Sequence, residues 1–155
     1  MKQIYILSGA VQTGKTTKLM QWAFHQKNIN GIFQPVVDDK RCIYHIGSRT
    51  LKLLEADNVS NENIITIGKY KFLKSTFEWS QSILIDCLNK NLDWIIIDEI
   101  GPLELEGNGL EPAISKILIE NVNNNVNILC VVRNSILEKY IDHYQLKDKY
   151  KLFNS

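Results

Sequence analysis

The sequence predicts an α/β protein of three layers, with a mainly parallel central sheet covered by helices on both faces. Short apolar segments alternate along the chain with longer amphipathic ones, which is the pattern of strands connected by helices. Residues 94–97 are continuously apolar, as expected of a parallel strand that is buried on both faces. The length of 155 residues, 45% of them hydrophobic, fits one domain that covers residues 1–155.

The first half of the chain predicts a strand, a helix and then a group of short strands. The apolar residues 3–7 form the first strand and lead into a glycine-rich turn. A helix should begin near Gly14, since helical spacing then relates Thr16, Leu19, Met20 and Ala23. Short apolar runs predict strands at residues 32–37, 41–46, 50–55 and 64–67, with a polar turn at 58–63. The first two runs flank Asp38-Asp39-Lys40 and predict an antiparallel hairpin inserted after the first helix.

The second half alternates helices with core strands. Ser75 is expected to cap a helix that runs to about Asn89, with Leu84, Cys87 and Leu88 on one face. After the strand at 94–97, a second helix carries an apolar face formed by Leu110, Ala113, Ile114, Ile117 and Leu118. The tract 121–125 ends it, and residues 128–132 form a second core strand. Asn134 or Ser135 should cap a last helix, and residues 149–153 should close the sheet as an edge strand.

Charge and composition limit the classes of partner. Eighteen Lys and Arg against seventeen Asp and Glu give a net charge of +1, so we expect no nucleic-acid surface. No apolar run approaches the roughly eighteen residues of a membrane helix, and the start of the chain lacks the features of a signal peptide. The three cysteines are widely spaced and are expected to be buried thiols. The sequence therefore predicts a cytoplasmic protein without a membrane contact, and we expect a monomer.

The chain carries a phosphate-binding motif between its first strand and first helix. Residues 9–16 fit the Walker A pattern G-x-x-x-x-G-K-[ST] at every fixed position. In this P-loop, successive backbone N–H groups and the positive end of the helix dipole face the phosphates. Lys15 is expected to neutralise the β- and γ-phosphates, and the Thr16 hydroxyl to bind Mg²⁺. The predicted nucleotide-binding residues are Gly9, Ala10, Val11, Gln12, Thr13, Gly14, Lys15, Thr16 and Thr17.

A second motif follows at the end of the strand at 94–97. Asp98 and Glu99 come directly after the apolar strand, as in a Walker B motif. Asp98 is expected to complete the magnesium site with Thr16 by holding a water of the Mg²⁺ shell, because open α/β sheets place their ligands at the carboxyl ends of strands. Glu99 is expected to accept a hydrogen bond from the attacking water and to act as general base. An acidic pair of this kind is typical of the RecA-like group of P-loop folds, which have an additional strand between the two motif strands and a catalytic Glu.

Three further residues have two interpretations each. Arg133 follows the core strand at 128–132, where it is expected to stabilise charge on the γ-phosphate, although arginines after strands are common at protein surfaces. Arg41 contacts the nucleotide or lies on a hairpin edge, where charges discourage aggregation. Glu104 orients its loop or pairs with a cation.

The motifs resemble those of the small nucleoside-triphosphatase family first described in thermophiles, which includes the cancer-related nucleoside-triphosphatase. The segment Asp98-Glu99-Ile100-Gly101-Pro102-Leu103-Glu104-Leu105 follows that family's signature, and weaker matches occur at Gly31, Arg41, Gly68-Lys69-Tyr70 and Phe77-Glu78. The resemblance implies slow, Mg²⁺-dependent hydrolysis of several nucleoside triphosphates. The chain departs from the family pattern in the hairpin, at residues 34–39 and at Ile43, so contacts made there do not transfer from the family.

Two other functions use the same loop. A nucleotide or small-molecule kinase would need an acceptor pocket and usually an Arg-bearing lid, and no long Arg-rich insertion is present in the sequence. A nucleotide-dependent switch or assembly factor would use hydrolysis as a timer and would respond to a partner. Hydrolysis is favoured over transfer by the Asp98-Glu99 pair, because a kinase needs no base for water.

Overall fold

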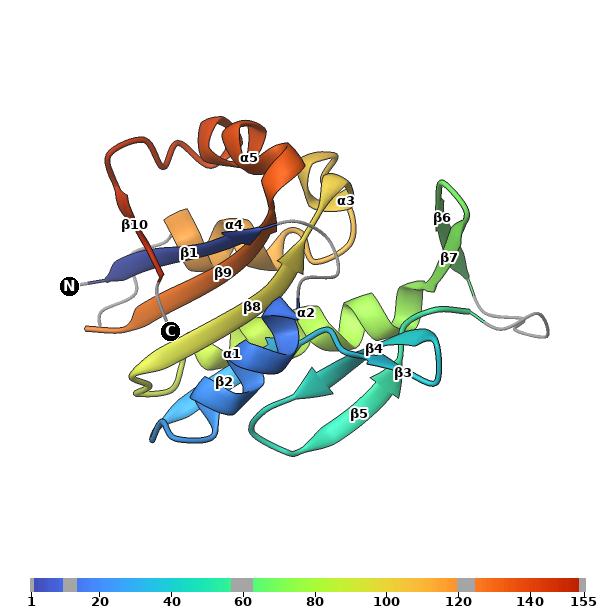
Figure 1. Ribbon diagram of the computed structural model, residues 1–155, viewed down its shortest axis with the longest axis horizontal. Coiled ribbons are helices and arrows are strands. Elements are labelled where there is room, and N and C mark those ends of the chain that lie inside the picture. Colours follow the sequence, from blue (N-terminus) through green and yellow to red (C-terminus); the bar gives the residue numbers. More distant parts are fainter. Residues whose placement is uncertain (1, 10–13, 57–62, 120–124, 154–155) are drawn as a thin grey trace.

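A computed structural model describes residues 2–9, 14–56, 63–119 and 125–153, with the description of Lys15 confined to its backbone. In this part of the chain eight strands form one sheet, which is parallel from β10 to β2. Along the sheet they are β10 (Tyr150–Leu152), β1 (Gln3–Gly9), β9 (Asn127–Arg133), β8 (Trp94–Ile100), β2 (Ile29–Phe33), β4 (Lys40–His45) and β3 (Val36–Val37), with β5 (Thr50–Leu53) paired to β4 (Figure 1).

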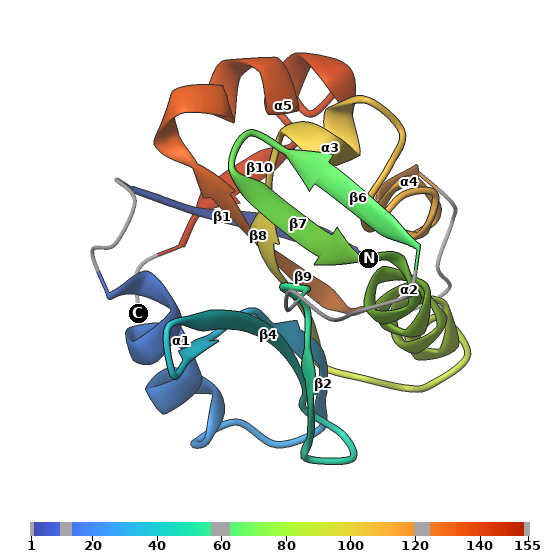
Figure 2. The ribbon, with the colours of Figure 1, turned by 90° about the vertical axis from the view of Figure 1, so that its right-hand side faces the viewer.

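Helices cover both faces of this sheet, and Figure 2 shows α1 on one side with α2 and α4 on the other. The helices are α1 (Lys15–Ala23), α2 (Lys74–Cys87), α3 (Pro102–Leu105), α4 (Ala113–Ile119) and α5 (Leu137–His143), with a 3₁₀ turn η1 (Asn134–Ile136) before α5. Alternate residues of β8 enter opposite cores, since Ile95 and Ile97 pack with α2 and α4 whereas Ile96 packs with Leu19 of α1. The three-layer α/β prediction is therefore confirmed.

The order of the strands matches the expected group of folds. β1 precedes the phosphate-binding loop and β8 carries Asp98, and β9 lies between them with parallel pairing to both. This is the additional strand predicted from the Asp98-Glu99 pair. The carboxyl ends of β1, β9 and β8 thereby meet at one edge, where open α/β sheets bind ligands.

The antiparallel insertion is present, but its first strand was assigned wrongly from the sequence. The predicted strand at 32–37 is divided at Gln34-Pro35 into β2 and β3, and β2 begins earlier, at Ile29. β2 pairs in parallel with β8 and belongs to the central sheet, while β4 pairs antiparallel with β2, β3 and β5. Pro35 has no N–H for a ladder bond, and its carbonyl accepts from Cys42 instead.

A separate two-stranded sheet is formed by β6 (Ile64–Ile67) and β7 (Tyr70–Leu73), which project beside the main sheet (Figure 1). β6 was expected and β7 was not. The predicted turn at 58–63 lies outside the described residues except for Asn63. The chain passes directly from β7 into α2, so that Tyr70 and Phe72 stand near the start of that helix.

Both predicted helix caps were wrong. Leu73 occupies the N-cap position of α2, so Ser75 lies inside the first turn, because β7 continues up to the helix and the Leu73 N–H donates to Leu54. Asn134 and Ser135 form the 3₁₀ turn, and Ile136 precedes α5. None of the helices in the described part of the chain is both long and apolar enough to cross a membrane.

Candidate active site

The phosphate-binding end begins where β1 stops at Gly9. Residues 10–13 lie outside the described part, and the chain re-enters it at Gly14, whose φ of 76° places it in the left-handed region as the N-cap of α1. Glycine adopts this conformation at no steric cost. The first turn of α1 thus begins at the carboxyl edge of the sheet, and the predicted residues Thr16 and Thr17 lie in it.

Thr16 and Asp98 lie together at this edge, as predicted. The Thr16 hydroxyl donates to Asp98 Oδ2 at 2.9 Å, and the backbone N–H of Gln34 donates to the same oxygen at 2.9 Å. Asp98 is fully buried in β8, so these bonds stabilise a carboxylate that would otherwise be costly to bury. Since Thr16 donates its only hydroxyl proton to Asp98, its oxygen lone pairs are available to a cation.

Glu99 sits on a bulge in β8. Ile97 pairs with Cys130 and Ile100 with Val132, so β8 contains one residue more than β9 between these points. Glu99 has a φ of 64°, a conformation that costs a non-glycine residue about 1–3 kcal/mol. In a regular strand the side chains of Asp98 and Glu99 would point to opposite faces. The bulge breaks this alternation beside the end of β9.

Two arginines converge on Glu99. Arg133, the last residue of β9, donates its Nε–H to Glu99 Oε1 at 2.7 Å. Arg41 of β4 places its Nη1 3.9 Å from the same oxygen and also donates to Gln34 Oε1 at 3.3 Å. A continuous polar network therefore links Thr16, Asp98, Gln34, Arg41, Glu99 and Arg133.

Comparison with known proteins identifies the family. A family described as NTPase matches residues 4–154. The chain belongs to this NTPase family. Nucleoside triphosphates are therefore its substrates and their hydrolysis is its general activity, as the resemblance at Asp98 to Leu105 implied.

Two solved structures share the fold. The crystal structure of THEP1 from the hyperthermophile Aquifex aeolicus has 20% identity and a TM-score of 0.68, with 99% of this chain and 89% of that chain covered. The solution structure of a human cancer-related nucleoside triphosphatase has 18% identity and a TM-score of 0.72, with 98% and 88% covered. A search of curated proteins by sequence found no match.

Glu104, one of the residues with two interpretations, organises a loop of this NTPase. Its Oε1 accepts from the Gly101 N–H at 2.7 Å and its Oε2 from the Leu110 N–H at 3.0 Å. The first bond belongs to a capping box at the start of α3, a four-residue helix that the sequence analysis did not predict. Burial raises the pKa of Glu104 to about 7, against the effect of these N–H donors. Both carboxyl oxygens are thus engaged by the backbone.

A cavity of about 240 Å³ opens beside Glu99. Its polar end is lined by Gln34, Arg41, Glu99, Glu104 and Arg133, and its apolar wall includes Tyr70, Phe72 and Phe77. The cavity volume is several times the roughly 30 Å³ that one water occupies in the liquid. The cavity lies at the carboxyl ends of β8 and β9, on the side of Glu99 that faces the insertion.

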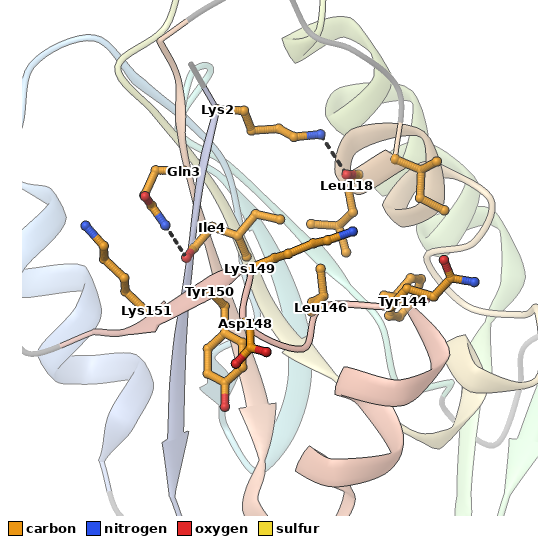
Figure 3. A pocket seen from close by; sticks show the side chains of 12 residues that line it. Lys2, Gln3, Ile4, Leu118, Tyr144, Leu146, Asp148, Lys149, Tyr150 and Lys151 are labelled. Atoms are coloured by element: carbon orange, nitrogen blue, oxygen red, sulfur yellow. Dashed lines mark hydrogen bonds between the residues drawn. The ribbon is translucent and has the colours of Figure 1, made fainter.

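A larger cavity of about 590 Å³ lies at the opposite end of the sheet (Figure 3). It is lined by residues at the starts of β1 and β10, including Gln3 and Tyr150, together with Lys2, whose Nζ donates to Leu118 O at 2.6 Å. Ligands of open α/β sheets bind at the carboxyl ends of the strands. The larger cavity therefore does not belong to the NTPase site.

The sequence analysis missed two residues of the site. Gln34 joins Asp98 to Arg41, and the ring of Tyr70 lies under the Arg41 guanidinium, with 5.2 Å between Cζ and the ring centroid. Gln34 directly follows β2, so its position at a strand end would have indicated it if β2 had been recognised. Tyr70 stands in the Gly68-Lys69-Tyr70 match to the family pattern, but that match gave it no role, because its contact with Arg41 joins two different sheets.

Proposed function

We propose that the chain hydrolyses nucleoside triphosphates to diphosphate and phosphate in a Mg²⁺-dependent reaction, with Glu99 as general base. The oxygen of a water attacks the γ-phosphorus in line, and the bond from the γ-phosphorus to the bridging oxygen breaks. The diphosphate leaves with the electron pair of that bond, and Glu99 accepts a proton of the water. The polar network that joins the Thr16–Asp98 pair to Glu99 and Arg133 supports this proposal.

The donor set of this network fits Mg²⁺. Thr16 and Asp98 offer a hydroxyl and a carboxylate oxygen that are 2.9 Å apart. Mg²⁺ prefers oxygen ligands and is usually held by one or two protein groups together with substrate phosphates and water. Bound there, the ion would neutralise charge on the β- and γ-phosphates. Asp98 would help to hold the Mg²⁺ ion indirectly, through its hydrogen bond to Thr16 or through a bound water.

The remaining roles follow from charge. The P-loop, Gly9 to Thr17, would surround the phosphates with backbone N–H groups, and Lys15 would neutralise their charge at the β- and γ-positions. Arg133 would stabilise charge on the γ-phosphate in the transition state, since its guanidinium already lies against Glu99. Thr16, Asp98, Glu99 and Arg133 all act on phosphate, metal or water. This supports broad specificity for the base, which the family resemblance also implies.

The test is phosphate release from ATP, GTP, CTP and UTP, with and without Mg²⁺, for the parent and for Lys15→Ala. We expect comparable rates with the four nucleotides, loss of activity without Mg²⁺, and a rate about a hundredfold or more lower in Lys15→Ala, because a fixed cation at the transferring group is removed. Release from only one nucleotide would contradict broad specificity. Release that needs an added acceptor would contradict hydrolysis and favour a kinase.

A further inference from the structure

The charges around Glu99 do not balance. Arg133 and Arg41 share the single oxygen Oε1 of Glu99, at 2.7 and 3.9 Å. The three side chains are largely shielded from water, with exposures of 29% for Arg133, 15% for Arg41 and 19% for Glu99. Within the described residues neither guanidinium has an ion pair with another carboxylate. Two shielded cations therefore face one anion, and electrostatics favours a second anion here.

The other acids nearby do not fill this role. Glu55 accepts from the backbone N–H of Arg41 at 3.0 Å, and within the described residues it forms no ion pair with the Arg41 guanidinium. Glu104 lines the same cavity, but both its oxygens accept from backbone N–H groups. The second anion is therefore expected to come from a bound ligand.

Arg41 is held in place from both sides. Its guanidinium lies over the Tyr70 ring of β7, and its Nη1 donates to Gln34, whose backbone N–H binds Asp98. Arginine has five N–H donors, and the hydrogen bond to Gln34 uses one of them within the described residues. The side chain is thus oriented by the insertion and retains donors for a phosphate.

A phosphate bound at the P-loop would approach Glu99 from the side of Thr16 and Asp98, and the cavity begins at Glu99. Thr16 and Asp98 mark the metal end, and the next residue, Glu99, marks the water that must lie in line beyond the γ-phosphorus. Arg41 and Arg133 line the cavity on this side of Glu99. A γ-phosphate would come within reach of both guanidinium groups, whereas a diphosphate would stop short of them.

We propose that Arg41 contacts the γ-phosphate and makes the site selective for triphosphates over diphosphates. The contact draws Arg41 away from Glu99 Oε1, which leaves that oxygen more available to the attacking water. Arg41 is then a catalytic residue, and Tyr70 and Gln34 are positioning residues for it. This inference rests on the proposed function, because it assumes that the triphosphate binds at the P-loop.

The test compares the affinities of a non-hydrolysable triphosphate, adenosine 5′-(β,γ-imido)triphosphate, and of ADP, each with Mg²⁺, for the parent, Arg41→Ala and Arg41→Lys. We expect Arg41→Ala to lose about ten- to a hundredfold of triphosphate affinity while ADP affinity changes less than about twofold, since one charge-assisted contact is lost. The triphosphate affinity of Arg41→Lys should fall between those of the parent and Arg41→Ala, because lysine keeps the charge but not the planar guanidinium. Arg49→Ala, an exposed arginine in the same insertion, is the matched control and should bind as the parent does.

A parallel loss for both nucleotides would overturn the proposal, since a purely structural Arg41 would weaken the whole site. Unchanged triphosphate affinity in Arg41→Ala would also overturn it. Thermal unfolding of each variant separates a folding defect from a binding defect, and Arg41→Lys extends the test if Arg41→Ala is unstable. Binding is measured without turnover, so a negative result for Arg41 leaves the role of Glu99 intact. Conversely, a Glu99 variant that has lost turnover can still be tested for selectivity between triphosphate and diphosphate.

Discussion

At the scale of single residues, the site depends on two adjacent acids whose environments differ. Asp98 is buried and accepts from Thr16 and from the Gln34 N–H, whereas Glu99 is partly exposed and faces two arginines. The bulge in β8 separates them, with the positive φ at Glu99 as its local cost. Asp98 is thereby suited to a metal site, and Glu99 to the activation of water.

Glu104 gives a prediction on pH dependence. Its pKa is raised by burial from 4.5 to about 7, so between these values the folded chain binds a proton that the unfolded chain has released. The contribution of Glu104 to stability is therefore present below about pH 4.5 and is lost as the pH rises to about 7. Glu104→Gln is neutral throughout and should remove this part of the slope.

The same substitution should also cost about 1–3 kcal/mol of stability, because an amide NH₂ cannot accept from one of the two N–H donors at Gly101 and Leu110. Urea unfolding at several pH values across this window measures both effects. Glu106→Gln, an exposed neighbour, is the control and should keep the parental slope. A Glu104→Gln variant with the full parental slope would show that another group titrates.

At the scale of elements, the close pairing of β2 with β8 aligns the insertion with the site. Gly31 pairs with Ile96, has a φ of 125°, and lies so close to β8 that a Cβ there would collide with the Ile96 backbone. Glycine is required both by the conformation and by the space. Three residues further on, β2 delivers Gln34 to Asp98.

Gly31→Ala should destabilise the protein by about 3 kcal/mol or more, since strained backbone and overlap with β8 add together. Gly107→Ala is the matched control: it has a φ of 83° but open space around a Cβ, so it should cost only about 1 kcal/mol. Chemical denaturation of both variants gives the comparison. Equal costs would mean that β2 and β8 separate easily to accept a side chain.

Local sequence pattern predicted the elements that carry their own signal. The apolar strands at β1, β8 and β9 and the amphipathic faces of α1, α2 and α4 follow from periodicity. The boundary between β2 and β3 was missed, although Gln34-Pro35 interrupts residues 32–37 and Pro35 cannot donate a ladder hydrogen bond. β7 and α3 have four residues each and, unlike the four-residue β6, no apolar run that would indicate them.

The residues of the site also fall into those that a local motif predicts and those that only the fold brings together. Thr16 and Asp98 were both assigned to the magnesium site because each occupies a fixed place in a motif, and the fold brings them within a hydrogen bond of each other. The convergence of Arg41, Gln34 and Tyr70 required three separate strand ends to come together. No spacing along the chain encodes that, so the environment of Glu99 emerged only from the fold.

In the whole molecule, helices packed on both faces of the sheet hold the edge at which the site lies. On one face α1 is held by an aromatic cluster in which Trp22 contacts Trp94 and Phe153 edge-on, each at 4.9 Å between centroids. On the other face α2 and α4 pack under β8 and β9. Thr16 on α1 and the acids on β8 are thereby fixed relative to one another, which supports a preorganised site.

Glu99 activates the attacking water in the proposed reaction, and Glu99→Gln removes this function alone. Glutamine has similar size but cannot take the proton, so we predict that Mg²⁺-dependent phosphate release falls about 10²- to 10⁴-fold. Affinity for the Mg²⁺–nucleotide complex should stay within about threefold, because Thr16 and Asp98 are unchanged. Glu106→Gln should release phosphate at the parental rate. Parental turnover in Glu99→Gln would contradict the assignment of the base and, with it, the account of the site.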